Sequence, residues 1–283
     1  MGVLSVGVVG GGTMGLGIAY VCLFNGVSVH LVEPHDARRA GLAQALRVAA
    51  QSGIERGKFN SDWVDERLRD IVYCASVEEL PLGLDWVIET VPEQLELKQN
   101  VLARISERSP KYIASNTSSM SLTSLSGSVS DSARFIGLHF FNPVWAIRLL
   151  EIILADGTNE HTQKEALVLA ERLGKTPIVV KDIPGFATSR LDLISALEAI
   201  RMLESGVASA EDIDKAAMLA YGHPVGPLRL SDIVGLDVRL DIAESLFQEY
   251  GERYAPPEYL KHMVAQGNLG QKTGQGFYNW SEE

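Results

Sequence analysis

Residues 3–15, VLSVGVVGGGTMG, constrain the fold of this chain more than any other segment. An apolar, β-branched run at 3–9 has the composition of a buried strand. It is followed at once by Gly10, Gly12 and Gly15, which match the pattern G-x-G-x-x-G. This pattern carries weight only where a strand precedes it and a helix follows, because the glycines make the turn between the two. Here both conditions hold, so the segment predicts the start of a βαβ unit.

The first two thirds of the chain alternate short apolar runs with helix-like segments. The apolar runs lie at residues 3–9, 27–33, 85–91, 111–115, 134–140, 149–154 and 176–180. The helix-like segments lie near residues 13–25, 35–57, 94–109 and 161–173. Continuous apolar strands separated by helices indicate a mostly parallel sheet covered on both faces. We therefore predict a Rossmann-type α/β domain.

A change of pattern follows Pro184-Gly185, after which no strand-like run occurs. An apolar stripe recurs there every three residues, at Leu191, Ile194, Leu197, Ile200 and Leu203. Ser209, with Asp212 three residues later, resembles the start of a further helix. The chain is thus predicted to hold a dinucleotide-binding domain over residues 1–184 and an all-helical domain over 185–283.

Composition and charge limit the classes of function. The 283 residues are 46% apolar and 22% charged, as in globular proteins. No apolar run reaches the roughly 18 residues that span a bilayer, and the N-terminus does not resemble a signal peptide. Cys22 and Cys74 match no disulfide framework or metal spacing, which predicts reduced core thiols, a cytoplasmic location and no metal site. A net charge of −11 argues against binding to nucleic acid or to an anionic membrane.

The glycine turn predicts a dinucleotide cofactor. Gly10 permits the tight turn, Gly12 lets a pyrophosphate approach the backbone, and Gly15 lets the helix pack closely on the sheet. Glu33 ends the second apolar run, about 20 residues further on, where a carboxylate accepts hydrogen bonds from ribose hydroxyls. A carboxylate there would repel a 2′-phosphate, so NAD is favoured over NADP, although Arg38 and Arg39 lie close by.

Residues 137–154, GLHFFNPVWAIRLLEIIL, hold the candidate reacting centre. Glu151 lies inside an apolar run, and a buried carboxylate needs a partner. His139 is the obvious one. The pair has two interpretations: a core ion pair, or a base whose tautomer is fixed by a carboxylate. Because His139 falls at the end of a strand, where open α/β sheets bind ligands, we favour catalysis.

Two further polar groups follow strands. Asn116-Thr117-Ser118-Ser119 closes the fourth run, and its hydroxyls and amide could hold a substrate oxygen or cap a helix. Glu93 and Lys98 lie at the start of a predicted helix, and from the sequence alone they are better explained as a helix N-terminal acid and a solvated lysine.

With these motifs, the chain resembles the short-chain L-3-hydroxyacyl-CoA dehydrogenases. The resemblance runs from end to end and includes VGVVGGGTMGLGIA, SNTSS, GLHFFNP, KDIPGF, GPLRLSDIVGLD and LGQKTGQGFYNW in matching order. It implies oxidation of an L-3-hydroxyacyl thioester with NAD. It also implies a helical domain that usually forms a homodimer, and an active site between the domains.

The resemblance assigns roles to individual residues. It places the catalytic histidine and its partner on His139 and Glu151, and the serine that orients the substrate on Ser118. Asn142 is the asparagine of the HFFNP motif. The nicotinamide side of the site falls on Glu93 and Lys98, and the ribose acid on Glu33.

Two departures from the family pattern bear on the substrate. Ser189 stands in the run GFATSRL where the family has an asparagine, and it offers one donor hydrogen where an amide offers two. The segment 45–59, which shapes the acyl-CoA site, keeps only Arg47, Arg56 and Lys58 as basic residues, and Trp145 replaces a smaller residue. The substrate is thus expected to be an acyl-CoA, with a thioester on a carrier protein or a free hydroxy acid as alternatives. A non-catalytic NAD-binding protein is a third interpretation.

Overall fold

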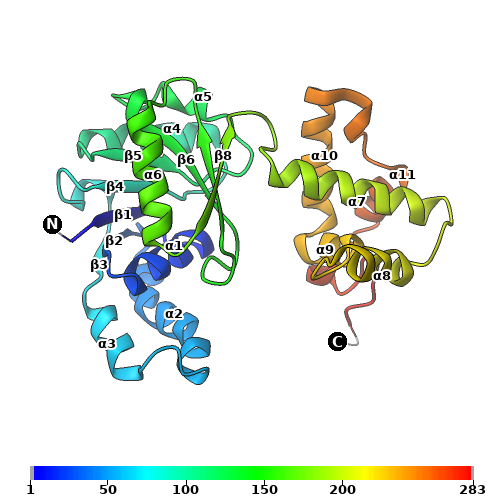
Figure 1. Ribbon diagram of the computed structural model, residues 1–283, viewed down its shortest axis with the longest axis horizontal. Coiled ribbons are helices and arrows are strands. Elements are labelled where there is room, and N and C mark those ends of the chain that lie inside the picture. Colours follow the sequence, from blue (N-terminus) through cyan, green and yellow to red (C-terminus); the bar gives the residue numbers. More distant parts are fainter. Residues whose placement is uncertain (1–2, 282–283) are drawn as a thin grey trace. The chain divides into compact units, whose positions relative to one another are not determined.

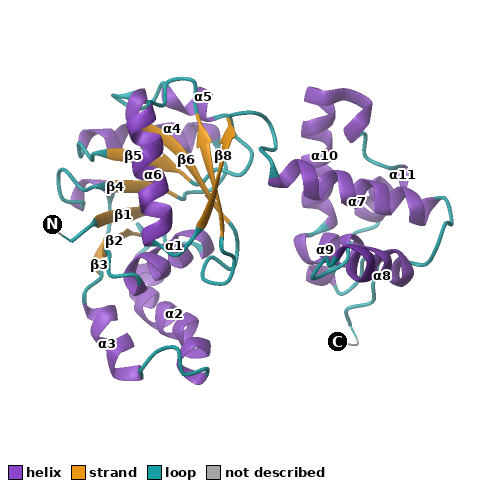
Figure 2. Ribbon diagram, in the orientation of Figure 1, coloured by secondary structure: helices purple, strands orange, loops and turns teal. Residues whose placement is uncertain are grey.

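The computed structural model describes residues 3–281 and divides into two compact units. The first unit ends at Ile183 and the second begins at Pro184. Strands occur only in the first unit, while the described part of the second, to residue 281, consists of helices and their connections (Figure 2). The predicted fold class, a Rossmann-type mostly parallel sheet followed by a helical domain, is confirmed.

An eight-stranded sheet forms the centre of the first unit (Figure 1). Its strands lie in the order β3-β2-β1-β4-β5-β6-β7-β8, and every neighbouring pair is parallel except β6 and β7. The bounds are Ser5–Val9 (β1), Ser28–Val32 (β2), Val72–Cys74 (β3), Trp86–Glu89 (β4), Tyr112–Ser115 (β5), Phe135–Phe140 (β6), Leu149–Leu154 (β7) and Thr176–Lys181 (β8). The order reverses beside β1, and such a reversal opens a crevice at the carboxyl ends of the strands.

Helices cover both faces of this sheet. Those of the first unit are Thr13–Phe24 (α1), Asp36–Glu55 (α2), Ser61–Arg69 (α3), Leu95–Glu107 (α4), Leu122–Ser126 (α5) and Glu160–Arg172 (α6). Apolar side chains of α1, α2 and α6 join those of the strands in one core. In Figure 1, α6 lies in front of the sheet and α4 behind it. Burial on both faces explains why the strands read as continuous apolar runs.

In the first unit the sequence missed three elements, the helices α3 and α5 and the strand β3. The chain does not proceed from α2 straight to the next central strand, because β3 pairs with β2 at the edge of the sheet. β3 has only three residues, and Val72 is 47% exposed, so it carries little of the apolar signal that marks the central strands.

The second unit is built from α7 to α11. Their bounds are Thr188–Glu204 (α7), Ala210–Tyr221 (α8), Pro227–Val234 (α9), Leu236–Tyr250 (α10) and Glu258–Ala265 (α11). Ser209 caps α8 as predicted, since its side chain accepts a hydrogen bond from the N–H of Asp212. The stripe expected on α7 is only partly right. Leu191 is 70% exposed and Leu193 is buried instead, because a period of three drifts away from the 3.6-residue turn of a helix.

Candidate functional site

The glycine turn joins β1 to α1 in the geometry that a pyrophosphate requires. Gly10 has φ +116°, which side chains rarely adopt, and a Cβ on Gly15 would lie 1.7 Å from the carbonyl oxygen of Gly10. A Cβ on Gly12 would meet nothing within 4 Å, so this point of the turn is open to a ligand. No side chain caps the N-terminus of α1, which leaves its N–H groups to bind an anion.

Glu33 follows β2 and is 3% exposed. Its Oε1 accepts a hydrogen bond of 3.0 Å from the N–H of His35. Arg39, which the sequence left as a possible 2′-phosphate ligand, is engaged by other groups: it pairs with Asp36 at 2.5 Å and donates to the carbonyl oxygen of Glu33 at 2.9 Å. This arrangement fits ribose hydroxyls better than a 2′-phosphate.

A cavity of about 340 Å³ lies beyond the carboxyl ends of β4, β5 and β6. It brings together five of the residues that the sequence singled out: Glu93, Lys98, Ser118, His139 and Asn142. Met14, Thr90, Val91, Asn116, Phe140 and Phe141 complete its wall.

His139 and Glu151 face each other across the antiparallel strands β6 and β7. Nδ1 of His139 lies 2.7 Å from Oε2 of Glu151. Glu151 is fully buried and His139 is 7% exposed, so the carboxylate is enclosed while the imidazole reaches the cavity. A carboxylate on Nδ1 fixes the tautomer of the ring and directs Nε2 to proton exchange.

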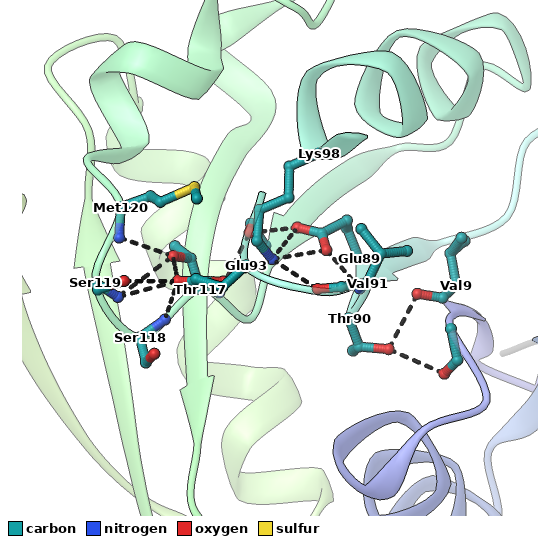
Figure 3. Close-up of polar contacts among 12 residues, drawn as sticks. Val9, Glu89, Thr90, Val91, Glu93, Lys98, Thr117, Ser118, Ser119 and Met120 are labelled. Atoms are coloured by element: carbon teal, nitrogen blue, oxygen red, sulfur yellow. Dashed lines mark hydrogen bonds and ion pairs between the residues drawn. The ribbon is translucent and has the colours of Figure 1, made fainter. Parts of the chain in front are cut away.

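Lys98 lies between two carboxylates (Figure 3). Its Nζ is 2.9 and 3.1 Å from the two oxygens of Glu89, 3.0 Å from Oε2 of Glu93 and 3.1 Å from the carbonyl oxygen of Val91. Lys98 is 1% exposed and Glu89 is fully buried. The ammonium therefore fixes the loop after β4, in addition to any contact with a cofactor.

Glu93 orders the loop after β5. Its Oε1 accepts hydrogen bonds from the hydroxyl of Thr117, the N–H of Ser118 and both the N–H and the hydroxyl of Ser119 (Figure 3). Burial raises the pKa of Glu93, but the nearby ammonium of Lys98 and these hydrogen bonds outweigh burial, so the pKa lies below its usual value. Neither Ser118 nor Ser119 is a helix cap, since Ser121 caps α5.

A second cavity, of about 370 Å³, lies between α1, the end of α2 and the loop after β6. It brings Arg56 and Lys58 together with Trp145, whose ring centroid is 5.3 Å from that of Tyr20. Arg148 and Lys175 add two further cations, whereas Arg47 lies outside and pairs with Asp65. The basic segment is thus reinforced by residues distant in sequence.

Ser189 is the second residue of α7, in the second unit, where it is half-buried. It is the one candidate residue that belongs to the second unit. The sequence also missed Glu89, the buried partner of Lys98. Its signal was present, because WVIE places a carboxylate at the end of an apolar strand, as in the run that holds Glu151.

Among residues 3–281, no helix combines the length and the apolar composition that a membrane span needs. Nor does any group of three or more His, Cys, Asp or Glu side chains within this range form a set that could hold a metal ion.

Comparisons with known proteins identify the family of this chain. Residues 5–183 match the model of the 3-hydroxyacyl-CoA dehydrogenase NAD binding domain, and residues 185–280 match that of the C-terminal domain of the same family. The human mitochondrial hydroxyacyl-coenzyme A dehydrogenase is 36% identical over 97% of this chain and 90% of its own length. A 3-hydroxybutyryl-CoA dehydrogenase of Mycobacterium tuberculosis is 37% identical over 97% of this chain and 98% of its own.

Solved structures show the same relationship. The crystal structure of (S)-3-hydroxybutyryl-CoA dehydrogenase from Ralstonia eutropha superposes with a TM-score of 0.94 at 38% identity, covering 99% of this chain and all of that one. The two family models and the fold therefore indicate the same family, and NAD is the cofactor. The chain belongs to the 3-hydroxyacyl-CoA dehydrogenase family.

Proposed function

We propose that this chain oxidises an L-3-hydroxyacyl-CoA to the 3-ketoacyl-CoA, reversibly, with His139 as the general base. The observation that carries the proposal is the pair formed by His139 and Glu151, 2.7 Å apart, at the wall of the cavity that follows the strand ends. Family membership supplies the reaction class, and this pair supplies the proton acceptor that the reaction needs.

The residues around the cavity divide the chemistry. Gly10, Gly12 and Gly15 admit the pyrophosphate, and Glu33 accepts from ribose hydroxyls. NAD, when bound, takes the hydride that leaves C3 of the substrate. The hydroxyl proton passes to Nε2 of His139, and the C3–O bond becomes a carbonyl. Transfer to a positioned base contributes about 10²–10⁴-fold in rate.

Glu151 stabilises the imidazolium that His139 becomes, because its carboxylate is held against Nδ1. We assign the orientation of the substrate to Ser118 and Asn142, which line the same cavity, and to Ser189 of α7. Glu93 and Lys98 complete the nicotinamide side. They also brace the loop that carries Ser118.

The second cavity supports CoA as the acyl carrier. Lys175 is buried, and its ammonium donates to the carbonyl oxygens of Val144 and Ile147. Arg56, Lys58 and Arg148 offer positive charge to phosphates, and the aromatic ring of Trp145 offers a surface to a base. A free hydroxy acid would leave these groups without a ligand, and a carrier protein would present a single phosphate. Measuring turnover of one 3-hydroxyacyl group on CoA, on carrier protein and as the free acid separates the three. Equal or better use of the free acid would contradict the assignment.

The proton acceptor is tested with His139→Gln. We expect at least about a 10²-fold loss of turnover while the affinity for NADH changes little, because the imidazole acts on the proton and not on the nucleotide. Turnover is followed by NADH absorbance and binding by NADH fluorescence. If activity survives, the pair with Glu151 is structural. If the wild type oxidises no 3-hydroxyacyl substrate, a non-catalytic NAD-binding role is the better interpretation.

We also propose that the protein is a cytoplasmic homodimer. At the end of α8, Leu219 and Tyr221 are 84% and 81% exposed, and a second copy of the chain would cover them. Cys22 and Cys74 are buried free thiols, as a reducing compartment allows. Light scattering should give a dimer for the wild type and a monomer for the double variant Leu219→Lys, Tyr221→Lys. Val48→Lys, at an exposed apolar position on α2, is the matched control and should remain dimeric.

A further inference from the structure

The side chain of Asn116 lines the cavity of the reacting centre, yet the proposed function gives it no task. Asn116 directly follows β5. Its Oδ1 accepts a hydrogen bond of 2.9 Å from the N–H of Phe140. Phe140 comes immediately after His139 on β6, so this bond joins the end of β5 to the end of β6 beside the imidazole.

The same bond determines which half of the amide is engaged. A backbone N–H can only donate, so the atom it meets must be the oxygen of Asn116, and the NH₂ group points elsewhere. Within residues 3–281 this NH₂ group has no hydrogen-bond partner. The buried side-chain atoms that lack a partner do not include its nitrogen. It is therefore accessible, and the space that Asn116 lines is the cavity with His139.

Apart from Ser118 and Asn142, which the proposed function already assigns to the substrate, several donors near this cavity are used within the protein. The ammonium of Lys98 lies within 3.1 Å of Glu89, Glu93 and the carbonyl oxygen of Val91. The hydroxyls of Thr117 and Ser119 donate to Glu93. The amide of Asn116 is, by contrast, a neutral donor. Its orientation is fixed by the hydrogen bond that its oxygen accepts from Phe140, and its NH₂ hydrogens are unused.

We propose that the NH₂ group of Asn116 donates a hydrogen bond to the oxygen on C3 of the substrate, an inference that rests on the proposed function. As the hydroxyl proton leaves for His139, negative charge develops on that oxygen until the C3–H electrons depart as hydride to NAD and the carbonyl forms. A donor fixed in advance stabilises this charge without reorganisation. In the reverse direction, hydride from NADH reaches C3 while the oxygen takes the proton from His139, and the same donor polarises the carbonyl.

Two variants separate this role from the structural bond to Phe140. Asn116→Asp keeps an oxygen for the N–H of Phe140 but loses the donor, whereas Asn116→Ala loses both. We expect both variants to lose about 10²-fold or more in kcat/KM for reduction of a 3-oxoacyl-CoA, the usual effect of removing one such donor. NADH affinity, measured by fluorescence titration, should stay within about threefold of wild type. Only Asn116→Ala should lower Tm, because it leaves a buried N–H unpaired.

Three results would overturn the inference. Loss of activity in Asn116→Ala alone would mean that the side chain only ties β5 to β6. Loss in Asn116→Asp alone would mean that the added charge, not the missing donor, is responsible. A parallel loss of NADH affinity in both variants would assign the donor to the nucleotide. A wild-type chain that reduces no 3-oxoacyl thioester would instead refute the proposed function, a result distinct from these three.

Discussion

Replacing Glu151 with glutamine changes one charge in the proposed proton relay while nearly preserving its shape. Glu151 is fully buried and lies 2.7 Å from Nδ1 of His139. A hydrogen bond to a charged group contributes about 1.5–3 kcal/mol, where a neutral one contributes about 1 kcal/mol. If the difference of about 0.5–2 kcal/mol is expressed when the imidazolium forms, the substitution slows the reaction about 2- to 30-fold, since each 1.36 kcal/mol is a factor of ten.

The assay measures three quantities on one preparation. We expect kcat for oxidation of a 3-hydroxyacyl-CoA to fall within that range, with NADH affinity unchanged. We expect the unfolding free energy, from urea titration, to fall by about 1–3 kcal/mol, because the new NH₂ group lies in a dry site. The proton on Nδ1 of His139, observed by NMR, should lose the downfield shift that a carboxylate partner gives.

Asp214→Asn is the matched control. Asp214 is a buried carboxylate of the second unit that accepts hydrogen bonds from two backbone N–H groups and from the hydroxyl of Tyr278. The variant should lose stability but keep kcat. The reasoning is refuted if Glu151→Gln keeps wild-type kcat, or if its loss of kcat is no larger than the fraction of protein that has unfolded.

Three further predictions concern the charged groups. Lys98→Met leaves Glu89 buried without its ammonium, so the unfolding free energy in urea should fall by about 3–5 kcal/mol; an unchanged value would mean that the ammonium adds nothing to the fold. Because the pKa of Glu93 is lowered in the folded protein from the ordinary 4.5, its contribution to stability is complete above that pH and is lost as pH falls through the folded pKa. The stability advantage of wild type over Glu93→Gln should therefore be full at pH 7 and shrink below about pH 4.5, and a constant difference would contradict this. Arg56→Ala should raise KM for a CoA thioester about tenfold at low salt with little change in kcat. Arg47→Ala, whose guanidinium already pairs with a carboxylate, is its control and should leave KM unchanged.

The sheet was predictable wherever burial acts on consecutive residues. Each central strand is covered on both faces, so its run of apolar residues identifies it as a strand without knowledge of its neighbours. β3, at the edge of the sheet, pairs with β2 alone, and only Cys74 of its three residues is buried, so it gives no such signal. The apolar stripe on α7 was predicted less well. Leu191 fits the spacing of three residues yet is exposed, because that spacing drifts around a helix of 3.6 residues per turn and leaves the buried side.

The reacting centre was predictable to the same extent. A glutamate inside an apolar strand requires a partner. His139 lies in the neighbouring apolar run, whereas His161 falls in a helix-like segment, so His139 and Glu151 could be paired from sequence. The hydrogen bonds of Glu93 could not be predicted, because Thr117 and Ser119 reach it from a loop more than 20 residues away. The hydrogen bond from the N–H of Phe140 to the amide oxygen of Asn116 could not be predicted either, because it depends on the pairing of β5 with β6.

Charge compensation distinguishes the buried carboxylates of the first unit from one another. Both oxygens of Glu89 accept from the ammonium of Lys98, and in addition Oε1 accepts from the N–H of Val91 and Oε2 from the hydroxyl of Ser115. This carboxylate is therefore saturated and can only hold the fold. Glu151 has the imidazole of His139, whose own charge would change during the proposed reaction, so the pair is suited to carry a proton. Glu33 is nearly as buried, yet among residues 3–281 its side chain receives only the backbone N–H of His35 and has no cation within 4.0 Å. A carboxylate so placed remains short of donors until hydroxyls reach it, and ribose carries two. The donor that each carboxylate lacks therefore predicts its role better than its depth of burial does.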